Sequence, residues 1–180
     1  MKFKAKIMTE EDIQRTLVRL SHQIIEKNHG IENICLLGIE TRGVPLANRI
    51  CDNIEKIEGV RVPVGKINIS LYRDDISKIV EKPAPSEQTL PFSVVGKTVI
   101  LIDDVIFTGR TARAAMEAVC AIGRPARIQL MALIDRGHAE LPIKANFVGK
   151  NIPSSLNEII EVRLSETDGV NEVVINEAEH

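Results

Sequence analysis

Residues 99–111, with the sequence VILIDDVIFTGRT, constrain the fold more than any other part of this chain. The first four residues are apolar without interruption, which is typical of a parallel strand covered on both faces. Asp103 and Asp104 follow, and small and apolar residues between Ala112 and Val119 indicate a helix after the turn. Sheets of this class bind ligands beyond the carboxyl ends of their strands. We therefore predict an α/β fold with a binding site at the two acids and the turn after them.

The residue types around this turn suit a phosphorylated sugar. Two adjacent carboxylates can accept hydrogen bonds from neighbouring ribose hydroxyls, while threonine hydroxyls and free amides at a helix start can bind a 5-phosphate. The run contains neither a Walker loop nor a GxGxxG motif. Ordinary capping of a strand or a helix would explain either half alone, but not the combination. The residues predicted to hold the sugar phosphate are Asp103, Asp104, Thr108, Gly109, Arg110 and Thr111.

A second turn of the same kind contains Thr41, Arg42 and Gly43, between an apolar run at residues 34–39 and a helical pattern at residues 44–57. A helix start beside an arginine can bind another anion, such as a diphosphate leaving group. The alternative interpretation is an ordinary strand-to-helix turn with one exposed arginine.

Arg73 precedes a proline-rich segment at residues 76–91. We interpret this segment as a long flexible loop, and such loops often form lids. A cation at the mouth of a lid can close over a diphosphate and exclude water. The alternative is a solvated ion pair between Arg73 and Asp74 or Asp75, which contributes little free energy.

The composition excludes several other classes of protein. A length of 180 residues favours a single domain, and 44% hydrophobic residues are enough for a core. A net charge of -2 argues against an overall basic nucleic-acid binder, although a local basic face stays open. Three widely spaced cysteines suggest neither a disulfide framework nor a zinc site. The first residues contain no apolar signal region and no stretch has transmembrane length, so we expect cytoplasmic residence.

Helical and strand periodicities alternate along the chain, as expected for a parallel sheet covered by helices. Thr9 and Asp12 resemble a capping box at the start of a first helix. The predicted helices are residues 9–28, 44–57 and the one after Thr111. The predicted strands are residues 34–39, 60–70, 99–102, 128–134, 159–164 and 172–175.

Residues 99–111 resemble the phosphoribosyl pyrophosphate (PRPP) binding motif of type I phosphoribosyltransferases. The segments GIETRG at residues 38–43, SLYRDD at 70–75, GRPARIQL and LIDRGHAELPI up to residue 143, and GKNIPSS at 149–155 are similar to one subfamily. That subfamily combines regulators of pyrimidine (pyr) operon attenuation with uracil phosphoribosyltransferase activity. The resemblance covers nearly the whole chain.

This resemblance implies a single domain over residues 1–180 with a type I phosphoribosyltransferase fold. Its parallel-sheet core would be flanked by helices and carry a small hood and a flexible lid loop at about 74–91. The implied reaction joins uracil to PRPP and gives UMP and pyrophosphate. Mg²⁺ would accompany PRPP and touch the protein weakly at Asp103 or Asp104.

The resemblance also implies a role for several side chains in catalysis. Asp103, Asp104, Arg42 and Arg73 would be catalytic through positioning and through stabilising the departing diphosphate. The loop that binds pyrophosphate would be Glu40, Thr41, Arg42 and Gly43, and the family sometimes has a strained or cis peptide before the threonine. Arg136 and His138 would contact the base, although an ordinary loop histidine remains an alternative for His138.

A second implied function is binding of the pyr mRNA leader, controlled by UMP or UTP. Arg15, Arg19 and His22 share one side of the first helix, and Lys144 and Lys150 would extend that patch. His22 and Lys150 match RNA-binding positions of the subfamily. Val18 replaces a threonine there, Ala139 replaces an arginine, and Lys144 is a milder change from arginine.

Alternatives to this second function stay open. The helix face can be simply solvated, and the chain can be a phosphoribosyltransferase alone, for uracil or for another base such as a purine or orotate. A homodimer or a larger homo-oligomer is the expected assembly, and two-fold symmetry would double any basic face.

Overall fold

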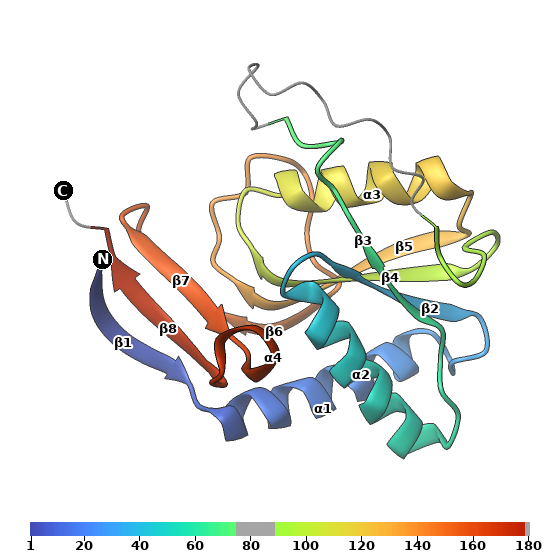
Figure 1. The fold of residues 1–180 in the computed structure, drawn as a ribbon, viewed down its shortest axis with the longest axis horizontal. Helices are drawn as coiled ribbons and strands as arrows, with labels where there is room; N and C mark the ends of the chain where they lie inside the picture. Colours follow the sequence, from blue (N-terminus) through green and yellow to red (C-terminus); the bar gives the residue numbers. More distant parts are fainter. Residues whose placement is uncertain (75–88, 179–180) are drawn as a thin grey trace.

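The computed structural model describes residues 1–74 and 89–178 and contains two sheets (Figure 1). The larger sheet has five strands that pair in parallel, as the apolar runs predicted. The predicted loop at residues 76–91 lies almost entirely outside the described residues. In spatial order the strands are β3 (Val64–Ile67), β2 (Ile34–Ile39), β4 (Thr98–Ile106), β5 (Arg127–Asp135) and β6 (Phe147–Asn151).

Three helices cover the two faces of this sheet (Figure 1). α1 (Glu10–Lys27) and α2 (Gly43–Glu58) pack on one face, and α3 (Arg110–Ile122) packs on the other. Successive strand residues alternate between the two faces. Leu36 and Ile100 therefore belong to the cluster under α1 and α2, whereas Leu37 and Leu101 belong to the cluster under α3. This double cover explains the uninterrupted apolar runs.

The first helix begins where its capping residues predicted. The backbone N–H of Asp12 donates to Thr9 Oγ1 at 3.2 Å, and the Asp12 carboxylate accepts from the Thr9 N–H at 2.9 Å. This capping box satisfies two amides that the helix itself leaves unpaired. Ile13, Leu17 and Leu20 lie fully or almost fully buried on one side of α1. The predicted helix at residues 9–28 is confirmed to within one residue at each end.

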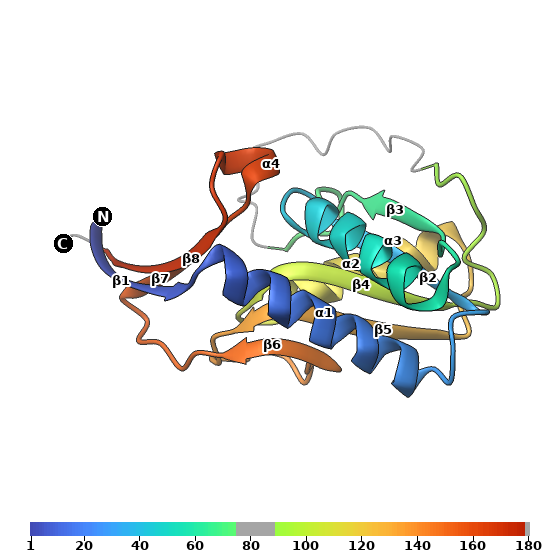
Figure 2. The same ribbon diagram turned by 90° about the horizontal axis from the view of Figure 1, so that it is seen from below.

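A smaller antiparallel sheet forms a hood at one end of the core. Its strands, in spatial order, are β1 (Lys2–Met8), β8 (Glu172–Glu177) and β7 (Glu158–Arg163). Figure 2 shows this sheet projecting from the core, with the short α4 (Ser165–Asp168) turned back toward the start of α2. Hood and core share one hydrophobic cluster, which includes Met8, Val162 and Val173. The carboxyl ends of β2 and β4 face the hood (Figure 1).

The structure corrects some of the predicted elements. The strand predicted at residues 60–70 is confined to β3, and the sequence analysis did not predict β1, β6 or α4. The two closing strands predicted at residues 159–164 and 172–175 are confirmed as β7 and β8. Within the described ranges, no helix combines the length and the apolarity needed to cross a membrane.

Candidate active site

Two adjoining pockets lie at the carboxyl edge of the parallel sheet. The first has a volume of about 370 Å³, and the second a volume of about 380 Å³. They share four lining residues, so together they form one composite cleft. The shared residues are Arg73, Asp103, Val105 and Thr111. The first pocket adds Glu40, Thr41, Arg42, Asn68, Ile69, Ser70 and Asp104, and the second adds Phe107, Thr108, Gly109, Arg110 and Glu140 among others.

The two acids lie inside β4, whereas the sequence analysis expected them just after the end of the strand. Strand pairing continues from Asp103 to Ile106 because β5 extends far enough to supply partners up to Asp135. Neighbouring strand residues point to opposite faces of a sheet. Both acids line the first pocket, but only Asp103 also lines the second. The two carboxylates therefore reach the cleft from different sides of the strand.

Asp103 has an unusual protonation equilibrium. Burial raises its pKa well above the ordinary value, and the neighbouring charge of Asp104 raises it further. The Asp103 carboxylate also accepts a hydrogen bond from the Asp104 backbone N–H at 2.9 Å. Asp103 thus keeps its proton to a higher pH than an exposed aspartate does. Hydroxyl donors or a cation in the cleft would favour its charged form.

The turn after β4 presents the start of α3 to the second pocket. Gly109 is the N-cap of α3 and has a φ of 91°, which favours glycine over residues with a side chain. The first turn of α3 contains no acidic residue. Its amides and the positive end of the helix dipole therefore suit a phosphate. Thr108 does not cap α3, but its hydroxyl accepts a hydrogen bond from the Arg110 N–H at 3.3 Å.

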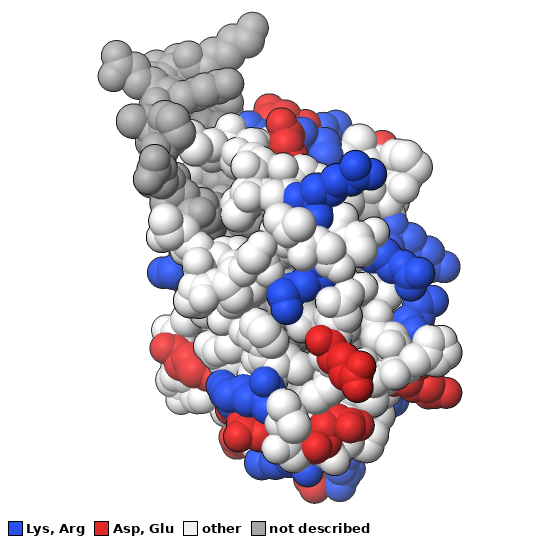
Figure 3. All heavy atoms as spheres, turned by 90° about the vertical axis from the view of Figure 1, so that its right-hand side faces the viewer, with Lys and Arg blue, Asp and Glu red and all other residues white. Residues whose placement is uncertain are grey.

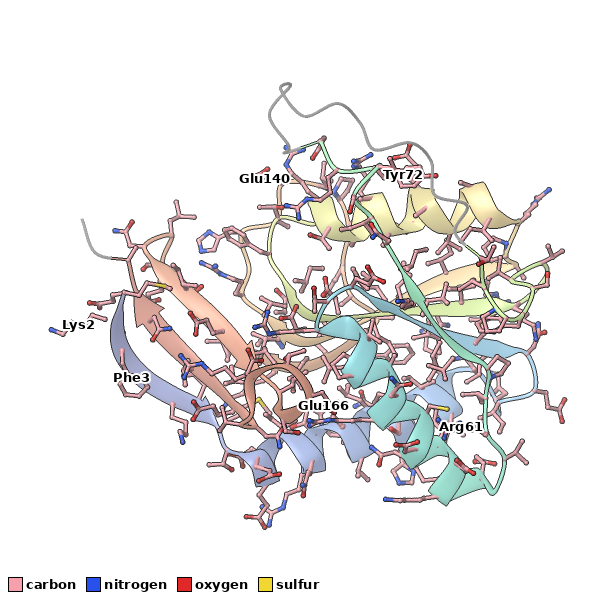
Figure 4. The ribbon with its side chains drawn as sticks, viewed as in Figure 1. Lys2, Phe3, Arg61, Tyr72, Glu140 and Glu166 are labelled. Atoms are coloured by element: carbon pink, nitrogen blue, oxygen red, sulfur yellow. The ribbon has the colours of Figure 1, made fainter. Side chains whose placement is uncertain are left out.

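Arg110 connects two segments on either side of this turn. Its Nη1 donates to Asp74 at 2.7 Å and its Nε donates to Glu140 at 2.8 Å. These two carboxylates raise the pKa of Arg110, with Glu140 as the larger cause. Figure 4 shows Tyr72 and Glu140 above α3, with Glu140 nearer the start of the helix. The side chain of Arg110 is therefore engaged by carboxylates that a bound phosphate would have to replace.

The loop after β2 is held tightly against β4. The Glu40–Thr41 peptide bond is cis, as the family resemblance implied for that position. A Cβ atom on Gly43 would lie 2.2 Å from the Ile102 carbonyl oxygen, and one on Gly38 would lie 2.5 Å from the Gly43 oxygen. Only glycine fits either position without a backbone shift. The segments at residues 38–43 and 102–104 therefore form one closely packed edge of the first pocket.

Arg42 crosses from this loop to the hood. Its Nη2 donates to Asp168 Oδ1 at 2.8 Å and its Nε donates to Asp168 Oδ2 at 3.3 Å. Asp168 raises the pKa of Arg42, and Arg42 in turn lowers the pKa of Asp168. The sequence analysis did not identify Asp168 as part of the site. It lies 126 positions from Arg42 in the sequence, so no local pattern pointed to it.

Known proteins resemble this chain over nearly its whole length. A model of the phosphoribosyl transferase domain matches residues 6–166. The chain belongs to the phosphoribosyl transferase family. The bifunctional protein PyrR of Thermoanaerobacter sp. (strain X514) is 56% identical over 177 residues, which are 98% of this chain and 99% of the relative. The bifunctional protein PyrR of Clostridioides difficile (strain 630) is 55% identical over 174 residues, 97% of this chain and 98% of the relative.

Solved structures agree on the fold of this phosphoribosyl transferase. A hypoxanthine phosphoribosyltransferase of Trypanosoma cruzi matches with a TM-score of 0.73 at 19% identity, over 98% of both chains. One from Staphylococcus aureus matches with a TM-score of 0.71 at 20% identity, over 96% of this chain and 92% of the other. The predicted type I fold is therefore confirmed, and so is the predicted kinship with the bifunctional PyrR proteins.

Two residues predicted to contact the base lie behind the cleft of the phosphoribosyl transferase. The guanidinium of Arg136 lies 4.0 Å from the ring centre of Phe107 and donates to the Glu158 carbonyl at 2.8 Å. A His138 ring nitrogen contacts the Ser154 carbonyl oxygen. Neither side chain lines the two pockets, whereas Phe107 lines the second. Phe107 was missed, although an aromatic residue within the motif was a visible signal.

Four of the five residues predicted to bind RNA come from adjacent elements, because α1 packs beside β6. Arg19 donates to the Gly149 carbonyl. The pKa of Asp12 is lowered first by hydrogen bonds from Thr9 and further by the charges of Arg15 and Lys150, so Lys150 lies near the start of α1. Arg15 and His22 are exposed on the same helix. Lys144 is exposed on the other side of the sheet, beside α3, where it lines a separate groove with Met116. The predicted patch therefore does not include Lys144.

The chain offers no closed metal centre in its described part. Among residues 1–74 and 89–178, no group of three or more His, Cys, Asp or Glu side chains is arranged to hold a metal ion.

On the face away from the hood, basic and acidic side chains are interspersed (Figure 3).

Proposed function

We propose that this chain catalyses the transfer of a phosphoribosyl group from PRPP to uracil, giving UMP and pyrophosphate. We further propose that it binds the pyr mRNA leader in a uridine-nucleotide-dependent way and so promotes transcription attenuation. One observation carries the enzymatic proposal. The acids of β4, the start of α3, and Arg42 and Arg73 surround one composite cleft in a phosphoribosyl transferase related to bifunctional PyrR proteins.

The proposed mechanism needs no covalent nucleophile from the protein. Asp103 and Asp104 would hold the ribose hydroxyls, and the first turn of α3 would hold the 5-phosphate with Thr108 to Thr111. Arg42 and Arg73 would stabilise the negative charge that develops on the departing diphosphate. Holding base and sugar in line would contribute to the rate enhancement. Exclusion of water would protect the sugar centre from hydrolysis.

Mg²⁺ fits this site as a companion of PRPP. Asp103 and Asp104 offer the oxygen ligands that Mg²⁺ prefers, and this ion usually keeps several waters and binds through substrate phosphates. When bound, it would neutralise part of the diphosphate charge. The loop at Glu40 to Gly43 would then bind the pyrophosphate through its amides and Arg42.

The base is proposed to lie toward Phe107, with Arg136 and His138 on the same side. Ile106, the residue before Phe107, gives the second pocket an apolar wall there. Arg136 and His138 fix the segment around Ser154 through hydrogen bonds. They would therefore shape the base site even where they do not contact the base directly.

Turnover with different bases tests the enzymatic proposal. Pure protein is incubated with PRPP, Mg²⁺ and uracil, hypoxanthine or orotate. We expect uracil to react fastest, and faster turnover of a purine or of orotate would overturn the choice of base. Asp104→Asn should sharply reduce PRPP use. The matched control is Asp52→Asn, which neutralises an exposed acid of α2 that pairs with Arg61. Its use of PRPP should be unaffected.

The RNA-binding proposal rests on the patch of Arg15, Arg19, His22 and Lys150 and on the kinship with bifunctional proteins. Binding of the cognate pyr leader RNA is measured with and without UMP or UTP. We expect nucleotide-dependent binding, and Lys150→Gln should weaken it and reduce the slope of log affinity against log salt by about 1. Arg124→Gln, which removes an exposed cation after α3, is the control.

A phosphoribosyltransferase without RNA regulation is the second candidate function. Val18 and Ala139 are exposed and lack the polar groups that the resemblance implied, and Lys144 lies outside the patch. Absence of nucleotide-dependent RNA binding at low salt would favour this candidate.

We also propose that the chain acts in the cytoplasm, where leader RNA is transcribed. We propose a homodimer or larger homo-oligomer as its assembly, and size-exclusion chromatography with light scattering would test this oligomeric state.

A further inference from the structure

The ion pair between Arg42 and Asp168 joins the catalytic core to the hood. Arg42 belongs to the loop before α2, and Asp168 is the last residue of α4, which turns back toward α2 (Figure 2). The two side chains meet through two hydrogen bonds, at 2.8 and 3.3 Å. The Arg42 side chain is 39% exposed and the Asp168 side chain 22%. Partly exposed ion pairs contribute little to stability, so this pair calls for another explanation.

Asp168 is fixed by its own surroundings as well as by Arg42. Its Oδ2 accepts from the Leu164 backbone N–H at 2.9 Å and from the Thr167 hydroxyl at 2.7 Å. Arg42 and these donors hold the pKa of Asp168 well below its usual range. The carboxylate is therefore charged at neutral pH and has a defined orientation. An anion that attracts Arg42 would not easily displace the Asp168 carboxylate, because the Leu164 N–H and the Thr167 hydroxyl would still hold that carboxylate in place.

The geometry leaves part of the Arg42 guanidinium available for a second anion. A guanidinium has five N–H donors, and Asp168 uses one on Nε and one on Nη2. Nη1 makes no hydrogen bond to any residue within 1–74 or 89–178, and Arg42 lines the first pocket beside Thr41 and Asp104. An unrestrained arginine loses rotamer entropy when it binds. Arg42 has already lost part of this freedom.

We propose that Asp168 is a positioning residue for diphosphate binding. It holds the Nε edge of Arg42 and turns the remaining donors toward the diphosphate of PRPP. This inference rests on the proposed function. It predicts that Asp168 affects ligands with a diphosphate and not ligands without one. UMP is the ideal comparison, because it shares the ribose and the 5-phosphate with PRPP but carries the base where PRPP carries the diphosphate.

Calorimetric titration of Asp168→Asn with PRPP and with UMP tests this role, in the presence of Mg²⁺. We expect PRPP affinity to fall by about tenfold to a hundredfold, as for other small misplacements of catalytic groups. UMP affinity should change by less than about twofold. Glu166→Gln is the matched control, because Glu166 lies on the same helix and pairs with Arg49 outside both pockets (Figure 4). It should bind both ligands like the wild type.

Arg42→Lys supplies an independent check, because lysine cannot form the two-point contact. In this background Asp168→Asn should have little further effect on PRPP affinity. Equal or tighter PRPP binding by Asp168→Asn in the wild-type background would refute the role, since Asp168 would then be a competitor for Arg42. Parallel loss of PRPP and UMP would refute it too, because the hood itself would have failed. Wild-type protein that binds UMP but not PRPP would overturn the proposed function together with this inference.

Discussion

Replacing Gly43 by alanine tests whether the loop at residues 40–43 must lie directly against β4. The new Cβ would lie 2.2 Å from the Ile102 carbonyl oxygen and 3.2 Å from the Ile102 carbonyl carbon. A relaxed contact between carbon and oxygen is about 3.3 Å, so the loop must move by about 1 Å. Both sides of the contact are backbone, and neither can rotate away as a side chain would.

The expected size of the effect follows from that shift. Overpacking of this kind lowers the unfolding free energy by about 1 to 3 kcal/mol. In a chain of this length each kcal/mol corresponds to about 2 to 4 °C in Tm. A displacement of about 1 Å in a positioning group reduces turnover by about a hundredfold. We therefore expect Gly43→Ala to fold, to melt at a lower temperature, and to lose about a hundredfold in kcat/KM for PRPP.

Gly59→Ala is the matched control for this experiment. Gly59 ends α2 at the opposite end from Gly43, has a φ of 75°, and has no atom within 4 Å of an added Cβ. Alanine there is strained by about 1 to 2 kcal/mol without any clash. Both variants should thus lose stability in thermal unfolding, but only Gly43→Ala should lose activity. Normal PRPP kinetics in a folded Gly43→Ala protein, or an equal loss in Gly59→Ala, would refute the reasoning.

Three further predictions concern stability. Since the pKa of Asp103 is raised in the fold, its stabilising contribution is full below the ordinary value of 3.8 and is lost as pH rises through the raised value. In urea unfolding, Asp103→Asn should therefore gain stability relative to wild type as the pH rises from 3.8 toward the raised value; a constant difference would contradict this cause. Thr9→Ala should lose about 1 kcal/mol in the same assay, and no loss would show that the capping box is idle. Hood and core share one hydrophobic cluster, so circular dichroism and hydrogen exchange should report a single transition rather than two.

Local sequence patterns predicted the strands that are covered on both faces and the helix whose start is capped. β2 begins and ends at the predicted residues because a strand buried on both faces must be apolar throughout. α1 was equally predictable, since Thr9 and Asp12 mark its start and a buried stripe runs along it. In both cases the signal that predicts the element lies within the element itself or at its cap.

The hood was only partly predictable: its strands β7 and β8 follow from local patterns, but β1 and its pairing do not, because that contact is remote in sequence. β1 pairs with β8 at the other end of the chain, for example Lys2 with Glu177. Nothing near residue 2 indicates that partner. The extension of β4 through Asp103 was missed for the same reason, since it depends on how far β5 continues. The site residues on strand-to-helix turns were therefore predictable. Those that the hood contributes were not.

Two of the arginines that meet anions in the proposed reaction, Arg110 and Arg42, illustrate how surroundings decide the fate of similar ion pairs. Arg110 meets Asp74 and Glu140, whose side chains are 40% and 52% exposed and which solvent can readily stabilise after separation. Arg42 meets Asp168, which is less exposed and accepts two further hydrogen bonds from its own segment. A 5-phosphate can therefore replace the partners of Arg110 at small expense. A diphosphate, by contrast, should bind Arg42 while Asp168 stays bound to it. A carboxylate therefore acts as a displaceable partner at one end of the cleft and as a fixed support at the other.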